Sequence, residues 1–304
     1  MKVINIALTS AVLAMAQASP IATRETTITD ADILNYALTL EHLEATFYED
    51  GLKNYTREDF LEAGFQDPFY ANLQEVASDE KKHVAFLTQA LTAAGASPVE
   101  RCTYSFPSTN VKTFLALASV LEGVGVSAYL GAAASIANKD YLTAAGSILT
   151  VEARHSAYLR ATIGEVPFPQ PFDDPLDLDE VYTVASPFIT SCPSSNGKLP
   201  VKAFPSLTVK STSTIRSGSK VSVVAGSGFD DSNLGNLHAA FITVTGPVWT
   251  PLHYRGDKSF TVTVPDGVAG QSYVVITKGK SQVTDDNIVA GPAIIEVASP
   301  KSTK

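Results

Sequence analysis

Two four-residue stretches decide the fold: EKKH at residues 80–83 and EARH at residues 152–155. In each stretch a glutamate and a histidine are three residues apart, so on a helix both side chains leave the same face. One such stretch often arises by chance on a solvated helix surface. Two of them in separate long helices, at matching depth, predict a shared buried site between those helices.

Helix periodicity and helix punctuation extend from about residue 28 to residue 165. They predict four helices of roughly 25 residues each, a length typical of a four-helix bundle. Helix starts are indicated by capping residues and by a proline in the first turn. The expected helices are 29–54, 68–95, 110–138 and 140–164, with Thr29, Asn110 and Asp140 as caps.

Each expected helix carries a glutamate about 12 residues after its start, which places the carboxylate roughly 18 Å along the helix and near its middle. Four carboxylates then meet at one level, whether neighbouring helices run parallel or antiparallel. One glutamate from each of two helices and a Glu-x-x-His pair from each of the others is the ligand set of a carboxylate-bridged dinuclear metal site. The predicted ligands are Glu41, Glu80, His83, Glu122, Glu152 and His155.

The chemistry of two metal ions asks for this donor set. Four carboxylates neutralise two divalent cations, and one imidazole per ion completes a mixed nitrogen and oxygen shell that suits iron or manganese. Two iron ions are expected, with manganese or zinc as alternatives. Buried carboxylates without a partner would cost several kcal/mol each, which disfavours a metal-free structural role. Glu44 also faces inward, so either Glu41 or Glu44 could be the ligand of the first helix, or Glu44 an additional one.

Two tyrosines repeat the same spacing. Tyr48 is seven residues after Glu41 and Tyr129 is seven after Glu122, so each lies two turns along the face of its glutamate. Helices one and three therefore resemble each other, and so do two and four, as in a duplicated helical hairpin. The tyrosines fit electron donors and core packing equally well. His42 is one residue off the ligand face and is expected outside the ligand set.

The hydrophobic period changes to two in the last third of the chain. Residues 166–200 predict a connector with one short helix. Alternating segments separated by Gly and Pro turns then extend over residues 201–298 and predict an immunoglobulin-like antiparallel β-sandwich. The fold class is thus mainly α, a helical bundle followed by a β domain.

The N-terminus predicts export. Residues 3–16 are apolar and Ala-Gln-Ala at 16–18 fits a cleavage site, so residues 1–18 are expected to be a signal peptide. The apolar run is shorter than the ~20 residues of a membrane span, and no transmembrane anchor is expected. Secretion makes a glycan on Asn54 the expectation, within the sole sequon. It also favours a Cys102–Cys192 disulfide over two buried free thiols.

Charge narrows the range of partners. The chain has 22 Lys and Arg against 31 Asp and Glu, a formal net charge of −9. Nucleic-acid binding needs a basic face and is not expected. The oligomeric state stays open.

The bundle motifs carry a resemblance to a known family. LEHLEATFY at 40–48, the two Glu-x-x-His stretches and Glu122-x6-Tyr129 resemble the ferritin-like superfamily, which includes rubrerythrins and bacterioferritins. The signal, ASPFITSCP at 185–193 and the β-rich tail are similar to fungal secreted ferritin-like proteins of stress-response, late-sexual-development and desiccation-related types. The resemblance implies iron at the six predicted ligands.

Three functions follow as expectations. The first is a di-iron oxidase or peroxide-consuming enzyme, and the second is iron binding without turnover, for protection outside the cell. The third is an extracellular or cell-wall interaction protein whose β-sandwich binds a polysaccharide or a protein. For that surface the candidate aromatic contacts are Trp249, Tyr254 and Tyr273.

Overall fold

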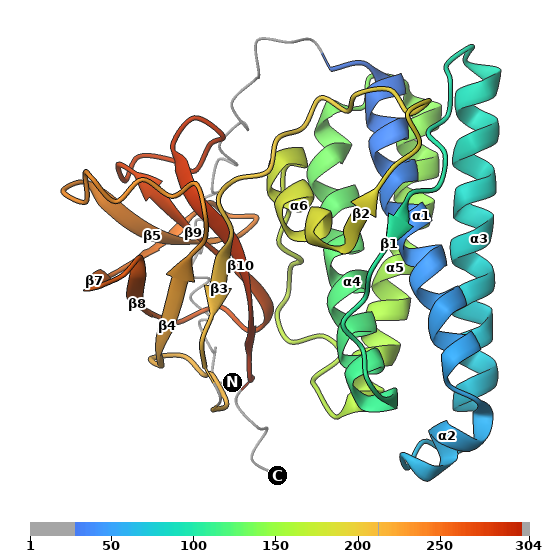
Figure 1. Ribbon diagram of the computed structural model, residues 1–304, viewed down its shortest axis with the longest axis horizontal. Coiled ribbons are helices and arrows are strands. Elements are labelled where there is room, and N and C mark those ends of the chain that lie inside the picture. Colours follow the sequence, from blue (N-terminus) through green and yellow to red (C-terminus); the bar gives the residue numbers. More distant parts are fainter. Residues whose placement is uncertain (1–27, 212, 300–304) are drawn as a thin grey trace, which may run out of the picture.

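The computed structural model describes residues 28–211 and 213–299. They form a helical bundle followed by two packed antiparallel sheets, which confirms the predicted fold class (Figure 1). The predicted signal peptide, residues 1–18, lies outside the described residues.

Four long helices form the bundle: α1 (Asp30–Asn54), α3 (Phe69–Ala93), α4 (Val111–Ala132) and α5 (Lys139–Ile163). α1 packs along α3, α4 packs along α5, and α1 also contacts α4. The short helix α2 (Arg57–Glu62) follows α1 and was not predicted, although the capping box of Thr56 and Asp59 is a sequence signal for it. The short 3₁₀ helix η1 (Ala133–Ser135) extends α4.

Side-chain caps define where the bundle helices begin. Thr29 and Asp32 form the expected capping box of α1, and Asn110 caps α4. The expected cap of α5 was wrong, because the side chain of Asn138 accepts the Asp140 backbone N–H at 2.8 Å. Asp140 instead lies in the first turn of α5, where its negative charge interacts favourably with the positive end of the helix dipole.

α4 is the most buried helix of the bundle, and with η1 it spans Val111–Ser135. Within residues 28–211 and 213–299, this is the one helix long and apolar enough to cross a bilayer, with a mean hydropathy of 1.6. It contacts α1, α5 and the connector helix α6 (Leu178–Ala185), and it faces the β sheets (Figure 1). Because α4 lies between the other bundle helices on one side and the sheets on the other, most of its surface is buried, which accounts for its apolar composition.

A disulfide ties the connector to the bundle. Cys102 and Cys192 are bonded across a sequence separation of 90 residues. Beside the bond, β1 (Thr103–Tyr104) pairs with β2 (Ile189–Ser191), which follows the 3₁₀ turn η2 (Ser186–Phe188). The loop after α3 is therefore held against the connector by a covalent bond and a short sheet.

The β region is a sandwich of two four-stranded sheets. This confirms the predicted antiparallel sandwich, and the strand orders correspond to the A-B-E-D and G-F-C-C′ sheets of immunoglobulin-type domains. The first sheet has the order β3 (Leu207–Val209), β4 (Lys220–Ala225), β8 (Ser259–Thr263), β7 (Leu252–Gly256). The second has the order β10 (Ile288–Val297), β9 (Gly270–Lys278), β5 (Leu237–Ile242), β6 (Val248–Thr250).

The central strand β9 is buried on both of its faces. Val274 and Ile276 pack in the interior of the sandwich, whereas Tyr273 and Val275 belong to the hydrophobic core of the bundle. Successive side chains of a strand point to opposite faces, so β9 contributes side chains to the core of the sandwich and to the core of the bundle. The bundle and the sandwich are thus joined by a continuous apolar interface.

Candidate metal centre

The six predicted ligands converge in the middle of the bundle, and all six are buried. The four glutamates are 0% exposed, and the two histidines are 8% and 7% exposed. Each of the four long helices contributes at least one of them: Glu41 from α1, Glu80 and His83 from α3, Glu122 from α4, Glu152 and His155 from α5.

The ligands form two overlapping groups, in each of which the candidate donor atoms lie within 4.8 Å of one another. The first group consists of Glu41, Glu80, His83 and Glu152, and the second of Glu80, Glu122, Glu152 and His155. Glu80 and Glu152 belong to both. Shared carboxylates flanked by one unshared glutamate and one histidine on each side are the arrangement that holds a pair of ions.

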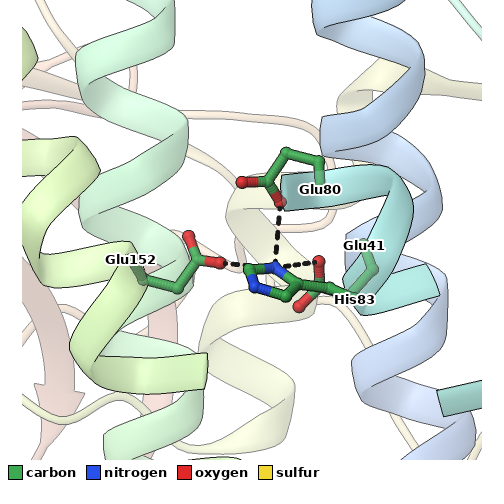
Figure 2. A group of neighbouring side chains, drawn as sticks. All are labelled: Glu41, Glu80, His83 and Glu152. Carbon is green, nitrogen blue, oxygen red and sulfur yellow. Dashed lines mark ion pairs between the residues drawn. The ribbon is translucent and has the colours of Figure 1, made fainter. Parts of the chain in front are cut away.

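The first group surrounds the ring nitrogen of His83 (Figure 2). Its Nδ1 lies 3.2 Å from Glu41 Oε2, 3.4 Å from Glu80 Oε2 and 3.2 Å from Glu152 Oε1. Donor atoms about 2.1 Å from a common ion are spaced about 3 Å apart. The four side chains therefore face one point.

The second group surrounds the ring nitrogen of His155. Its Nδ1 lies 3.1 Å from Glu80 Oε1 and 3.3 Å from Glu122 Oε2. The two oxygens of Glu80 thus face different histidines, which is the geometry of a bridging carboxylate. On its other edge, His155 Nε2 lies 3.5 Å from Asp79 Oδ2. A carboxylate behind a ligating imidazole fixes its orientation, and the sequence analysis missed Asp79 although it directly precedes Glu80.

Within residues 28–211 and 213–299, the donor atoms have no hydrogen-bond partner outside the two groups, and their close contacts are the carboxylate–imidazole pairs inside them. Buried polar atoms are almost always paired, and an unpaired buried carboxylate costs several kcal/mol. So many unpaired acceptors at one place fit two divalent cations. The unpartnered atoms of the two groups are Glu41 Oε2, both carboxylate oxygens of Glu80 and of Glu152, Glu122 Oε2, and Nδ1 of His83 and His155.

The two tyrosines orient the two unshared glutamates. Tyr129 donates a hydrogen bond to Glu41 Oε1, and Tyr48 donates one to Glu122 Oε1. The pairing is crossed, since each tyrosine reaches the glutamate of the other helix. Burial, reinforced by the neighbouring carboxylates, raises the pKa of both tyrosines well above the ordinary value, so they remain protonated donors. Each glutamate is left with one oxygen directed at its group.

Glu44 is buried beside the ligands but belongs to neither group. Its carboxylate reaches across to α4 at Gly125, where an added Cβ would lie 3.0 Å from Glu44 Oε1 and 3.2 Å from Glu152 Oε2. Burial, followed by repulsion from Glu80, raises the pKa of Glu44 well above its ordinary value. The Glu44 carboxyl group therefore sits next to the donor atoms, in space that Gly125 leaves free.

Protons replace metal charge when no cation is bound. Burial raises the pKa of Glu41 to about 7 and that of Glu152 well above its ordinary value. Burial opposes charged imidazoles, but the adjacent carboxylates outweigh it and raise the pKa of His83 and of His155 to about 10. Burial alone would raise the pKa of Glu80, yet His155 and His83 hold it below its ordinary value.

An apolar cavity of about 30 Å³ lies between the four bundle helices and is lined by Tyr129, the residue that donates to Glu41. Leu40, Leu87 and Tyr129 are among its lining residues, and half-exposed Phe86 contributes to it from α3. A water-sized molecule needs roughly 10–15 Å³, and a cavity that takes benzene has about 150 Å³. The cavity therefore suits a very small neutral molecule.

The other candidate residues lie apart from the metal centre. His42 Nε2 donates to the Val99 carbonyl at 3.2 Å, outside the two groups. Asn54 is exposed at the end of α1. Of the aromatic residues considered for a carbohydrate surface, Tyr273 is 1% exposed, Trp249 is half-buried and Tyr254 is exposed. Tyr273 therefore faces the bundle and not a ligand in solvent.

Three comparisons with known proteins place similarity in the bundle or over a part of the chain. Residues 29–165 match the family model described as a ferritin-like domain. Protein rds1 of Schizosaccharomyces pombe (strain 972 / ATCC 24843) is 28% identical over 181 residues, and the match spans 59% of this chain and 44% of that relative. A structure described as ferritin like, diiron-carboxylate proteins from Bacillus anthracis str. Ames has 16% identity and a TM-score of 0.39, over 44% of this chain and 94% of that one.

The family match begins at the capping threonine of α1 and ends just after α5. It thus contains all four ligand-bearing helices and leaves out the connector and the sandwich. Residues 29–165 of this chain form a ferritin-like domain.

Proposed function

We propose that this protein binds two iron ions in the ferritin-like domain and consumes a small oxidant there. Eight buried donor atoms that converge without a hydrogen-bond partner are the observation that carries the proposal. The ligands are the two overlapping groups that share Glu80 and Glu152. Four carboxylates and two imidazoles suit iron, with manganese or zinc as alternatives.

The residues around the site favour turnover over storage. When bound, a pair of redox-active ions supplies electrons to dioxygen or peroxide. Tyr48 and Tyr129 hold Glu122 and Glu41 in place, and both can move a proton at those carboxylates. The apolar cavity beside Tyr129 admits a small neutral reactant and excludes ions.

The proposed setting is outside the cell, in stress protection or development. The disulfide between Cys102 and Cys192 supports an oxidising compartment, where such bonds persist. A cell-wall or carbohydrate contact through the β-sandwich has less support, because Tyr273 is buried against α4 and its hydroxyl donates to the Gly123 carbonyl.

Anaerobic loading with Fe²⁺ followed by exposure to oxygen or hydrogen peroxide tests the proposal. The expected result is two iron ions per chain and consumption of one oxidant. Glu80→Ala should lose both properties, whereas Glu75→Ala, the same change on the exposed face of α3, should keep both. Two bound ions without oxidant consumption would favour metal handling. A protein that takes up neither iron, manganese nor zinc would contradict the proposal.

A further inference from the structure

The sandwich contacts the bundle at the helical turn that carries Glu122. Tyr273 of β9 is buried, and its hydroxyl donates to the Gly123 carbonyl at 3.2 Å. The same hydroxyl lies 2.9 Å from Ser127 Oγ, one turn further along α4. A single side chain of the sandwich thus bonds to two successive turns of the ligand-bearing helix.

Gln271 extends this contact in the other direction along α4. Its Nε2 donates to the Val120 carbonyl at 3.2 Å and to the Tyr273 hydroxyl at 2.8 Å. The Gln271 amide occupies the space next to Gly123, where an added Cβ would lie 2.6 Å from Gln271 Oε1 and 2.7 Å from its Nε2 and would displace the amide. Carbonyls on both sides of Glu122 in sequence are therefore held from β9.

The equivalent turn of α1 is held differently. In the duplicated pattern, Glu41 corresponds to Glu122 and His42 to Gly123. His42 donates to the Val99 carbonyl in the loop that follows α3, so α1 is fixed by its own hairpin. On α4 the corresponding side chain is absent and the sandwich provides the hydrogen bonds.

We infer that Tyr273 and Gln271 are positioning residues for Glu122. Through them the β-sandwich fixes the orientation of α4 and so contributes to the geometry of the metal centre. This inference rests on the proposed metal site. Ligands must be held within about 0.5 Å of their working positions, and the orientation of α4 sets where the Glu122 carboxylate reaches. The sandwich should therefore affect the group that contains Glu122 and His155 more than the group that contains Glu41 and His83.

Titration of the metal-free protein with Co²⁺, followed by visible absorption, tests the inference without an activity assay. The wild-type protein should bind two ions per chain. Tyr273→Phe should weaken one of them by about 10–100-fold, the range for partners that orient a ligand, and leave the other unchanged. Glu296→Gln is the matched control, because it weakens a contact of the same interface, with Arg160 of α5, away from Glu122. It should leave both ions in place.

Histidine variants identify the affected ion. In a His83→Ala background, which impairs the first group, Tyr273→Phe should weaken the remaining ion. In a His155→Ala background it should have no effect on the remaining ion. Equal weakening of both ions, or the same loss in Glu296→Gln, would show a general structural role and overturn the inference.

The outcomes separate this inference from the proposed function. A wild-type protein that binds two ions together with an unchanged Tyr273→Phe variant would overturn the inference alone. A wild-type protein that binds no Co²⁺ would overturn both. If Tyr273→Phe does not fold, Gln271→Leu makes the same test, because it removes the hydrogen bond to Val120 and keeps the tyrosine.

Discussion

The hairpins α1–α3 and α4–α5 supply the same ligands, but different neighbours hold them in place. Each hairpin gives a glutamate from its first helix, a Glu-x-x-His pair from its second, and a tyrosine that crosses to the other hairpin. Between these common residues all six intervening positions differ, and at two of them a glycine of α4 replaces a polar side chain of α1. His42 and Glu44 of α1 correspond to Gly123 and Gly125 of α4.

Both glycines make room for a group that comes from elsewhere. Gly123 admits Gln271 of the sandwich, and Gly125 admits the carboxylates of Glu44 and Glu152. On α1 the side chains at these positions have partners of their own: His42 donates to Val99 in the loop after α3, and Glu44 occupies the space at Gly125. The comparison teaches that the metal site determines the ligands and tyrosines of both hairpins, whereas the residues between them are determined by what packs against each helix.

The largest expected effect separates shared from unshared ligands. Glu80→Ala or Glu152→Ala should reduce the iron content from two ions per chain to none, because each glutamate contributes to both groups. Glu41→Ala and Glu122→Ala should each leave one ion. Metal analysis after anaerobic loading measures this. Equal losses in all four variants would contradict the distinction between shared and unshared glutamates, and different losses in Glu41→Ala and Glu122→Ala would break the equivalence of the hairpins.

The second effect concerns the bond that holds the α1–α3 hairpin to the connector. Replacing Cys102 and Cys192 by alanine should lower the free energy of unfolding by about 4–5 kcal/mol, the chain-entropy value for a loop of this size. Neither cysteine belongs to the two groups of donor atoms, so the affinity for metal should stay the same in the folded variant. Urea unfolding, combined with a metal titration, checks both expectations. A variant as stable as the wild type would contradict the first.

The third effect probes the space at Gly125. Gly125→Ala should displace the Glu44 or Glu152 carboxylate by a few tenths of an ångström and weaken metal binding by about 10–100-fold. Combining it with Glu44→Ala should restore much of the affinity, because the carboxylate that competes for the space is gone. Gly146→Ala on α5 is the matched control, since no atom lies within 4 Å of its added Cβ. Unchanged affinity in Gly125→Ala would show that the carboxylates adapt.

The smallest effect is a pH dependence of the metal-free protein. The pKa values of His83 and His155 are raised from 6.5 to about 10, so the folded state holds their protons more tightly than the unfolded state. The stability from these groups is complete below pH 6.5 and is lost as the pH rises toward 10. The pKa of Glu41 is raised from 4.5 to about 7, so its contribution to stability is likewise lost with rising pH, between about pH 4.5 and pH 7.

Thermal unfolding between pH 6 and pH 9 measures this dependence. The Tm of the metal-free protein should fall by a few degrees per pH unit, and His83→Gln or His155→Gln should each remove part of the slope. Metal binding needs deprotonated ligands, so the Tm gain from bound metal should grow as the pH rises. A metal-free Tm that increases over this range would contradict the expected proton uptake.

The sequence determined the bundle, the sandwich and the convergence of the six donors. Helix period and depth are local properties of the chain, and a fixed rise per residue converts equal depth into a common level. The sequence predicts Asp140 as the N-cap of α5, whereas Asn138 caps the helix in the structure. Both residue types are good N-caps and they are two residues apart, which is within the usual error of a predicted helix boundary.

Tertiary structure decided the contacts that cross between elements. The choice between Glu41 and Glu44 depends on which carboxylate finds an imidazole and which finds the space at Gly125, and both lie on other helices. Tyr273 has the sequence features of a strand residue in any sandwich, and only the docking of β9 on α4 directs its hydroxyl to the turn of Glu122. Hydrogen bonding and packing across elements depend on distances between residues far apart in sequence, and no local period encodes those distances.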